Sequence, residues 1–329
     1  MFRRVLLAVV LVAAWSLLHP TAAHAWTPGT HIYLGEAILA NLRLLPPGVA
    51  SLLAAFPFDY LYGTIAPDTS IAKKYVPAGR HSHFWNVGQE TFDYAPSDAL
   101  RAFGLGYLSH LAADTIAHNY FVPRQLVLTA STRSMGHSYW ESRVETQLGQ
   151  KYSRKAREII RLDQSAADRH LERIISPTLF SVRTNRRIFR GMVRLAHTRG
   201  FHRAMQTAEE RSRWLLHNQD VERHLRIAYD LTVEMLGAAE QGGEAAKVRA
   251  LDPNGAQALR AAKRLRRKEL GLGSLGSPTR LLELAEERFG TRKLELGYWK
   301  ESRIERPWAD RKGVAHAPAS GPLAISSGE

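Results

Sequence analysis

The pattern of residues 98–121 predicts a helix that is apolar nearly all round, although His110, Asp114 and His118 lie among its apolar residues. The segment reads DALRAFGLGYLSHLAADTIAHNYF. Ser97 or Asp98 is the candidate N-cap, and we expect the helix to end before Pro123. A helix without a polar face is expected in the interior of a domain. The chain must therefore supply enough packed structure to surround this helix on every side.

The rest of the pattern is helical as well. Apolar residues recur at three- and four-residue spacing in residues 31–45, in residues 138–152 and in several segments between residues 152 and 240. The alternation typical of strands is almost absent. We therefore expect an all-α fold, a multi-helix bundle. Residues 57–97 are the exception, because their prolines, glycines and aromatics predict a long irregular region, and long loops are commonly functional.

The first 25 residues have the three parts of a secretory signal peptide. Arg3 and Arg4 give a positive start, an apolar run follows, and Ala23-His24-Ala25 matches a cleavage pattern. The apolar run is shorter than the roughly 20 residues of a membrane-spanning helix. We therefore expect cleavage after Ala25, export to the periplasm or out of the cell, and a mature chain that begins at Trp26.

Composition divides the mature chain into three parts. We expect a helical domain over residues 26–240, a basic helical region over residues 241–305 and a disordered tail over residues 306–329, which is rich in Pro, Ala, Gly and Ser. The formal charge of +14 becomes +12 when Arg3 and Arg4 are removed with the signal (14 − 2). This charge predicts attraction to anionic partners such as phospholipid headgroups or nucleic acid.

Six cations within nine residues of the basic region could form a docking face for an anionic membrane. A solvated helix face is the plainer interpretation of the same run. The six are Arg260, Lys263, Arg264, Arg266, Arg267 and Lys268.

Histidines and carboxylates recur at helical spacing. His110, Asp114 and His118 are four residues apart, so they project from one face of the predicted buried helix. His137 and Glu141 repeat the spacing on the next helix. Burying this many ionisable groups is costly unless cations hold the carboxylates ionised and the imidazoles neutral. The spacing therefore predicts a metal site.

Three more candidate ligands lie earlier in the chain. Asp68 and His83 belong to the predicted irregular region, and His31 lies near the start of the first helix. The chain has no cysteine, so only His, Asp, Glu and backbone groups can bind a metal. Such ligands suit zinc, and manganese or iron would accept a similar set.

From Trp26 to about Glu145, these residues resemble the zinc-dependent phospholipase C family of exported bacterial enzymes. Members are all-helical, hold three zinc ions and begin, after signal cleavage, with a tryptophan whose amino nitrogen and carbonyl oxygen bind zinc. The stretch GTHIYLGEAI also resembles, more distantly, the catalytic domain of GPI-specific phospholipase D. The resemblance implies three zinc sites, of which Trp26, His31 and Asp114 would hold one, Asp68, His83, His110 and Asp114 a second, and His118, His137 and Glu141 the third.

One spacing departs from the family pattern. Family members have a proline and five intervening residues between the bridging aspartate and the next histidine. Here only Thr115, Ile116 and Ala117 separate Asp114 from His118. The helix is therefore expected to continue unbroken through this region.

The resemblance implies a phospholipase C that hydrolyses phospholipid headgroups with a zinc-activated water. Asp68 would ligate zinc and is the candidate catalytic residue to accept the proton of that water. Single-strand-specific zinc nucleases are the alternative, because they share the tryptophan-terminal, three-zinc design and the basic charge would suit nucleic acid. However, Glu141 stands where those nucleases usually have aspartate, and they often have disulfides. A third hypothesis is a non-catalytic zinc-binding protein of the membrane surface, and the near-complete ligand set argues against it.

Overall fold

Helices account for all the regular secondary structure in the described part of this computed structural model, which confirms the predicted all-α fold. The structure describes residues 26–70, 79–129, 136–176, 180–196, 207, 212, 214–240, 245–271, 278–291 and 294–309. Within these ranges, no helix has both the length and the apolar character that a membrane span requires. The predicted signal peptide lies outside the described residues, so its cleavage and the export of the chain stay predictions.

The predicted buried helix forms the centre of the fold. It is α6, Asp98–Ile116, and every residue from Ala102 to Ile116 is buried. Ser97 is its N-cap, and the Ser97 hydroxyl accepts a hydrogen bond from the Leu100 amide at 3.4 Å. The helix therefore begins where the sequence predicted it.

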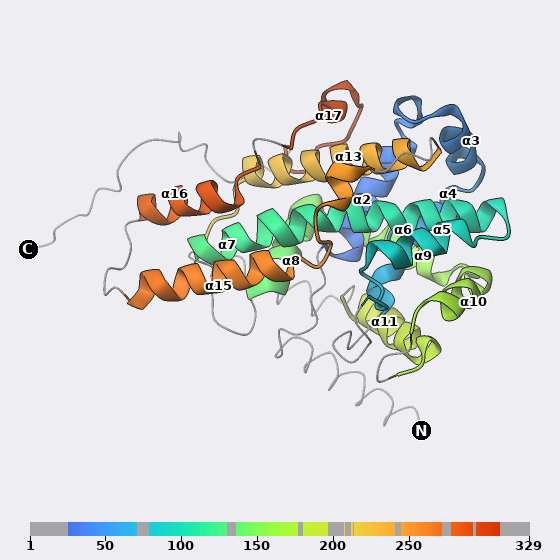
Figure 1. The fold of residues 1–329 in the computed structure, drawn as a ribbon, viewed down its shortest axis with the longest axis horizontal. Helices are drawn as coiled ribbons and strands as arrows, with labels where there is room; N and C mark the ends of the chain where they lie inside the picture. Colours follow the sequence, from blue (N-terminus) through green and yellow to red (C-terminus); the bar gives the residue numbers. More distant parts are fainter. Residues whose placement is uncertain are drawn as a thin grey trace, which may run out of the picture.

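The predicted end of this helix before Pro123 is wrong. The helical path continues through a π-helical turn, Ala117–Phe121, into α7, Val122–Leu128, so that α6 and α7 follow one another across the molecule (Figure 1). Pro123 lies in the first turn of α7, where its missing N–H is tolerated. π-helical turns inside longer helices occur frequently at functional sites.

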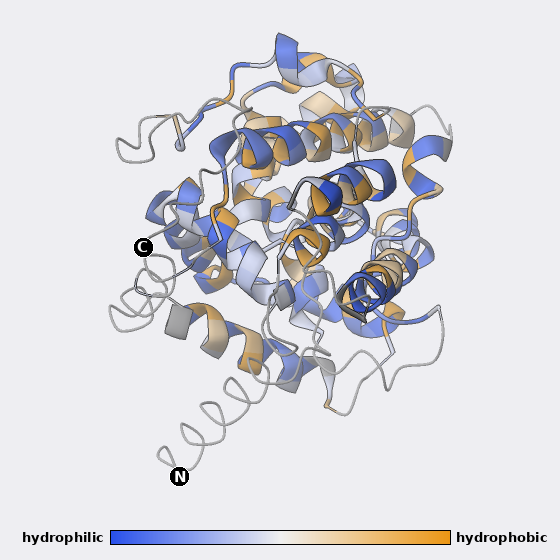
Figure 2. Ribbon diagram, turned by 90° about the vertical axis from the view of Figure 1, so that its left-hand side faces the viewer, coloured by the Kyte–Doolittle hydropathy of each residue, from blue (hydrophilic) through white to orange (hydrophobic). Residues whose placement is uncertain are grey.

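The other helices surround this axis. α4, Pro57–Gly63, α5, Trp85–Asp93, and α13, Asn218–Glu240, pack along α6. Two helices of the predicted basic region, α15, Ala256–Gly271, and α16, Pro278–Phe289, pack on α7. Blue and orange residues alternate along many of these helices in Figure 2, as expected when one face is polar and the other faces the core. The remaining helical elements are α2 (Pro28–Leu39), η1 (Leu42–Leu44), α3 (Pro47–Ala55), η2 (Ala66–Thr69), α8 (Gly136–Leu148), α9 (Gln150–Arg161), α10 (Ser165–Ile174), α11 (Val182–Ala196), α14 (Ala246–Arg249) and α17 (Tyr298–Glu301).

The prediction of one long irregular region over residues 57–97 is also wrong. Helices α4 and α5 and the 3₁₀ turn η2 lie within it. Pro57 is the first residue of α4, and Pro67 lies in the first turn of η2, so both prolines begin helices instead of interrupting them.

Two predicted helices are shorter than expected. The helix predicted over residues 31–45 runs from Pro28 to Leu39 and is followed by the separate 3₁₀ turn η1. The helix predicted over residues 138–152 is divided at Gly149, which has a φ of 81°. Glycine adopts this left-handed conformation at little cost, and it separates α8 from α9.

The predicted disordered tail begins too early at residue 306. Trp308 is 2% exposed, and its indole N–H donates to Glu222 at 3.4 Å. The Asn218 amide donates to the Trp308 carbonyl at 3.0 Å. Burial of a large aromatic ring holds this segment against α13, and residues 310–329 lie outside the described part.

Two glycines allow α4 to approach α6 closely. A Cβ atom at Gly63 would lie 2.1 Å from the Phe103 carbonyl oxygen, and one at Gly106 would lie 2.1 Å from the Tyr60 carbonyl oxygen. Neither position has room for a side chain. The contact brings the segment after α4, which carries Asp68, directly against the middle of α6.

Candidate metal centre

Five predicted ligands meet beside the middle of α6. His110 and Asp114 come from α6, Asp68 from η2, His31 from α2, and His83 from the residues just before α5. Each of the five is at most 1% exposed. Four segments that are distant in sequence therefore bring histidine and carboxylate side chains into one buried group, which we call the central group.

Asp114 lies between two sets of histidines. Its Oδ1 atom is 3.2 Å from His31 Nε2. Its Oδ2 atom is 3.1 Å from His110 Nε2 and 3.3 Å from His83 Nε2. The two oxygens of one carboxylate thus face different histidines, which is the arrangement that a bridging ligand requires.

Asp68 lies on the His83 side of the central group. Its Oδ1 atom is 3.3 Å from His83 Nε2 and 3.9 Å from His110 Nε2. The two Nε2 atoms of His83 and His110 are 3.1 Å apart. The carboxylate and the two ring nitrogens converge, as ligands of one cation would.

His110 is held in one orientation by the backbone. Its Nδ1–H donates to the Thr64 carbonyl at 2.8 Å, which leaves the lone pair on Nε2. The His110 ring stacks on His31 with 3.9 Å between centroids and meets His83 edge-on at 4.9 Å. A second hydrogen bond of this kind fixes the tautomer and direction of a metal-binding histidine.

The three other predicted side chains form a second group, which we call the lateral group. Ligand atoms of His118, His137 and Glu141 all lie within 4.8 Å of one another. His137 and Glu141 are one turn apart on α8, with 2.6 Å between Nε2 and Oε1. His118 comes from the π-helical turn, and its ring meets that of His137 edge-on at 5.1 Å. The short spacing between Asp114 and His118 therefore still brings His118 to its predicted neighbours.

Trp26 is bound to the backbone of the residue that precedes Asp114. Its side chain is fully buried, and its indole N–H donates to the Ala113 carbonyl at 3.0 Å. The indole also stacks on Phe121, with 5.2 Å between ring centroids. Two contacts with the α6–α7 axis thus hold the residue that would begin the mature chain, one of them directly before Asp114.

Burial and charge act together on the protonation of the central group. Burial lowers the pKa of His31, and the neighbouring His110 lowers it further. Burial opposes ionisation of Asp114, but the close ring nitrogens of His110, His31 and His83 hold its pKa well below the usual value. Burial also opposes protonation of His110, whose pKa is nevertheless raised by the Asp114 and Asp68 carboxylates. A divalent cation can replace a shared proton here, because it neutralises both carboxylates and binds neutral imidazole.

The donor atoms fit a metal. Among the described residues, no hydrogen-bond partner satisfies His31 Nε2 or either oxygen of Asp114, although all three atoms are buried. Unsatisfied buried carboxylate oxygens are costly unless a cation offsets them. Nitrogen and oxygen donors without thiolates are a set that zinc accepts.

The sequence did not predict the groups that orient the ligands. The Thr64 carbonyl behind His110 and the Pro253 carbonyl behind His118 are backbone atoms. Every residue type carries a carbonyl, so no residue identity could have indicated them.

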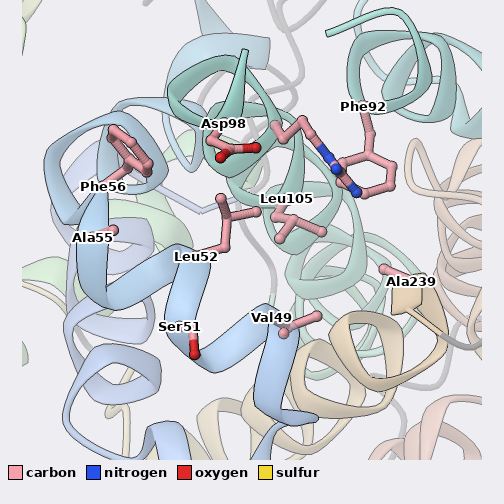
Figure 3. Close-up of a pocket in the computed structure, with 11 residues that line it drawn as sticks. Val49, Ser51, Leu52, Ala55, Phe56, Phe92, Asp98, Leu105 and Ala239 are labelled. Atoms are coloured by element: carbon pink, nitrogen blue, oxygen red, sulfur yellow. The ribbon is translucent and has the colours of Figure 1, made fainter. Parts of the chain in front are cut away.

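A separate pocket lies at the N-terminal end of α6. It has a volume of about 380 Å³ and is lined by residues of α3, α5, α6 and α13, among them Leu52, Phe92, Asp98 and Leu105 (Figure 3). None of the predicted ligands is among its lining residues. It therefore does not belong to the central or the lateral group.

Comparison with known protein families agrees with this geometry. Residues 30–183 match the family described as zinc dependent phospholipase C. The range includes every side chain of the central and lateral groups, and it extends past Glu145, where the resemblance visible in the sequence ended. Comparisons with curated proteins and with solved structures gave no match. Residues 30–183, which we call the family domain, are therefore similar to the zinc-dependent phospholipase C family, as the resemblance in the sequence implied.

Proposed function

We propose that the chain hydrolyses the phosphodiester bond of phospholipid headgroups and that three zinc ions take part. The match of residues 30–183 to the family supports a hydrolase of the phospholipase C type that requires zinc. The proposal of several zinc ions rests on the position of Asp114, whose two oxygens face different histidines in a buried group.

Two of the proposed zinc sites lie in the central group, where they share Asp114, and the third is the lateral group. His31 and Asp114 with the terminal Trp26 would hold one ion, and the lateral group another. Asp68, His83, His110 and Asp114 would hold the ion between them. When bound, zinc supplies positive charge to phosphate oxygens and lowers the pKa of water.

The chain's own side chains then have separate tasks. Asp114 bridges and stays ionised, because its neighbours hold its pKa low. His110 is held in place through Thr64. We assign proton acceptance to Asp68, whose carboxylate lies in the central group and is fully buried. Diacylglycerol would leave as the alcohol product of a phospholipid substrate.

Zinc content and hydrolysis measured on the same sample test this proposal. The exported chain should contain close to three zinc ions and cleave a phosphatidylcholine analogue faster than a fluorescent single-stranded oligonucleotide. Faster cleavage of the oligonucleotide would favour the nuclease alternative. Full zinc content without hydrolysis of either substrate would favour a non-catalytic role at the membrane surface.

The amino terminus provides a direct prediction. We expect one alanine inserted between Ala25 and Trp26 to remove one of the three zinc ions, because the terminal amine would move a residue away from its site. Zinc can be counted by mass spectrometry after the terminus has been sequenced. The control is one alanine added after Glu329, which should leave the zinc content unchanged. An unchanged count in the inserted variant would mean that the Trp26 amine is not a ligand.

We also propose that α15 contacts anionic lipid. Five of the six cations predicted from the sequence are exposed on this helix, and Arg266 is partly buried. Arg260, Lys263 and Arg267 follow helical spacing, so they share one face. Each cation near an anionic membrane contributes about 1 kcal/mol of attraction.

Changing Arg260, Lys263 and Arg267 together to glutamine should weaken binding to phosphatidylglycerol vesicles. We expect a loss of about tenfold or more at low salt, and a smaller loss at high salt, where charges are screened. The matched control changes Lys300, Arg303 and Arg306, which are also exposed and lie near α17, across the α6–α7 axis from α15 (Figure 1). Equal vesicle binding by both triple variants would contradict a specific role of α15.

A further inference from the structure

A short segment outside the family domain touches both groups of candidate ligands. Residues 251–255 lie between α14 and α15. The His118 ring donates through Nδ1 to the Pro253 carbonyl, and the Asn254 side-chain amide donates to the His83 carbonyl at 2.8 Å. His118 belongs to the lateral group and His83 to the central group, so five consecutive residues connect the two.

Two more side chains fasten this segment to the helices that carry the ligands. The Asn119 amide, from the residue after His118, donates to the Asp252 carbonyl at 2.7 Å. The Trp85 indole, from the first residue of α5, donates to the Leu251 carbonyl at 2.9 Å. The segment is therefore held from both sides, by the π-helical turn and by α5.

The segment also makes hydrogen bonds within itself. The Asp252 carboxylate accepts hydrogen bonds from the Asn254 amide at 2.9 Å and from the Ala256 amide at 3.2 Å. The Gly255 amide donates to the Asp252 carbonyl at 3.0 Å. Gly255 itself has a φ of 54°. The Asp252 side chain thus caps the start of α15 and sets the direction of the Pro253 carbonyl.

This carbonyl determines how His118 presents its ring. A carbonyl oxygen only accepts, so Nδ1 must carry a proton, and in the neutral ring Nε2 then carries the lone pair. Nε2 is then the only nitrogen of His118 available to a metal. Loss of such a contact behind a metal-binding histidine typically lowers metal affinity about 10- to 100-fold.

Gly255 shows how closely the segment approaches His118. A Cβ atom at Gly255 would lie 2.3 Å from the His118 carbonyl oxygen and 2.5 Å from the His118 Cβ atom. Any larger residue would push the segment and His118 apart. The His118 position and the C-terminal segment are thus packed as one unit.

We propose that residues 251–255 are a positioning segment for the zinc ion of the lateral group. The segment orients His118 through the Pro253 carbonyl. The hydrogen bond from Asn254 to the His83 carbonyl fixes the position of the lateral group relative to the central group. The inference rests on the proposed three-zinc centre. It adds that the family domain does not complete this centre alone, because the C-terminal part of the chain supplies the contact behind His118.

A pair of glycine variants tests the proposal in the full-length chain. Gly255→Ala introduces both a positive-φ alanine and the clash with His118. Gly297→Ala is the matched control, because Gly297 has a φ of 97° and no atom within 4 Å of the position of a Cβ. Both variants carry the backbone strain, and only the first disturbs the lateral group.

Zinc retention against increasing concentrations of a chelator is the main measurement. We expect Gly255→Ala to lose one zinc ion at a chelator concentration about 10- to 100-fold lower than the wild type requires, while the other two remain. Gly297→Ala should keep the wild-type profile, although both variants should unfold at a lower temperature. Cobalt substitution adds a spectroscopic readout, since the visible absorption of bound Co²⁺ should change in Gly255→Ala alone.

Asn254→Ala provides a second test if Gly255→Ala does not fold. It removes the hydrogen bond to the His83 carbonyl without adding an atom. We expect the affinity for the zinc ion of the lateral group to fall several-fold. Folded variants that retain all three ions with the wild-type profile would overturn the inference. A wild-type chain that binds no zinc would instead overturn the proposed centre itself.

Discussion

Changing Asp114 to asparagine is expected to remove two of the three proposed zinc ions at once. Oδ1 of Asp114 faces His31 and Oδ2 faces His83 and His110, at distances between 3.1 and 3.3 Å. Asparagine keeps the shape but replaces one oxygen with an NH₂ group, which has no lone pair for a metal. It also removes the negative charge that balances the cations.

We expect the rate of phosphodiester hydrolysis, as kcat/KM, to fall by about 10³-fold or more. Charge stabilisation by a catalytic metal amounts to several kcal/mol, and each 1.36 kcal/mol corresponds to a factor of about ten in rate. Zinc counting by mass spectrometry and initial rates on a phosphatidylcholine analogue would measure both effects on one preparation.

Asp230→Asn is the control for this variant. Asp230 is also buried, at 1% exposure, but its carboxylate accepts hydrogen bonds from the Leu296, Gly297 and Trp299 amides. This variant should unfold at a lower temperature and keep its zinc. If Asp114→Asn kept three zinc ions, Asp114 would not be a bridging ligand.

Changing Gly63 to alanine is expected to have the largest effect on stability. The new Cβ atom would lie 2.1 Å from the Phe103 carbonyl oxygen, and this oxygen belongs to the backbone of α6. Neither helix can relieve the overlap by rotating a side chain, so α4 must move away from α6. Overpacking of a core typically costs 1–3 kcal/mol, and a clash between two backbones belongs at the upper end, about 3 kcal/mol.

The displacement of α4 should also disturb the candidate metal centre. Thr64 directly follows Gly63, and its carbonyl holds His110, while Asp68 lies only a few residues further on. We expect the unfolding temperature to fall by about 5–10 °C and zinc to be lost at a lower chelator concentration. Thermal unfolding by circular dichroism, with and without added zinc, would measure both.

Gly237→Ala is the matched control. Gly237 also lies in a helix, α13, and no atom lies within 4 Å of the position of a Cβ. Alanine stabilises a helix interior by about 0.5–1 kcal/mol relative to glycine, so this variant should gain stability. If Gly63→Ala left the unfolding temperature unchanged, the stability of the fold would not depend on the close approach of α4 to α6.

Local periodicity was sufficient to predict part of the centre. The repeat of 3.6 residues per turn places His110 with Asp114, and His137 with Glu141, on one face of any helix that contains them. The apolar residues on nearly all sides of the helix predicted over residues 98–121 indicated a buried helix in the same way. These features depend on near neighbours in the chain, which is why the sequence alone was enough for them.

Other parts of the local structure were predicted wrongly. Prolines were interpreted as breaks at residues 57–97 and at Pro123, but Pro57, Pro67 and Pro123 all lie in first turns of helices. A proline is tolerated there because the N–H it lacks would have no helical partner. Whether a helix begins at such a proline depends on what the helix packs against, which the local sequence does not contain.

The sequence by itself determined the all-α class, the buried central helix, and the pairs of candidate ligands one turn apart. Only the tertiary structure decided which distant segments complete the centre. The approach of α4 to α6 carries Asp68 and the Thr64 carbonyl to His110, and the turn before α15 carries the Pro253 carbonyl to His118. Carbonyl groups are the same in every residue, and a close approach of helices depends on the packing of both. The two carbonyls and the approach of α4 to α6 therefore contribute to the centre only once the whole chain has folded.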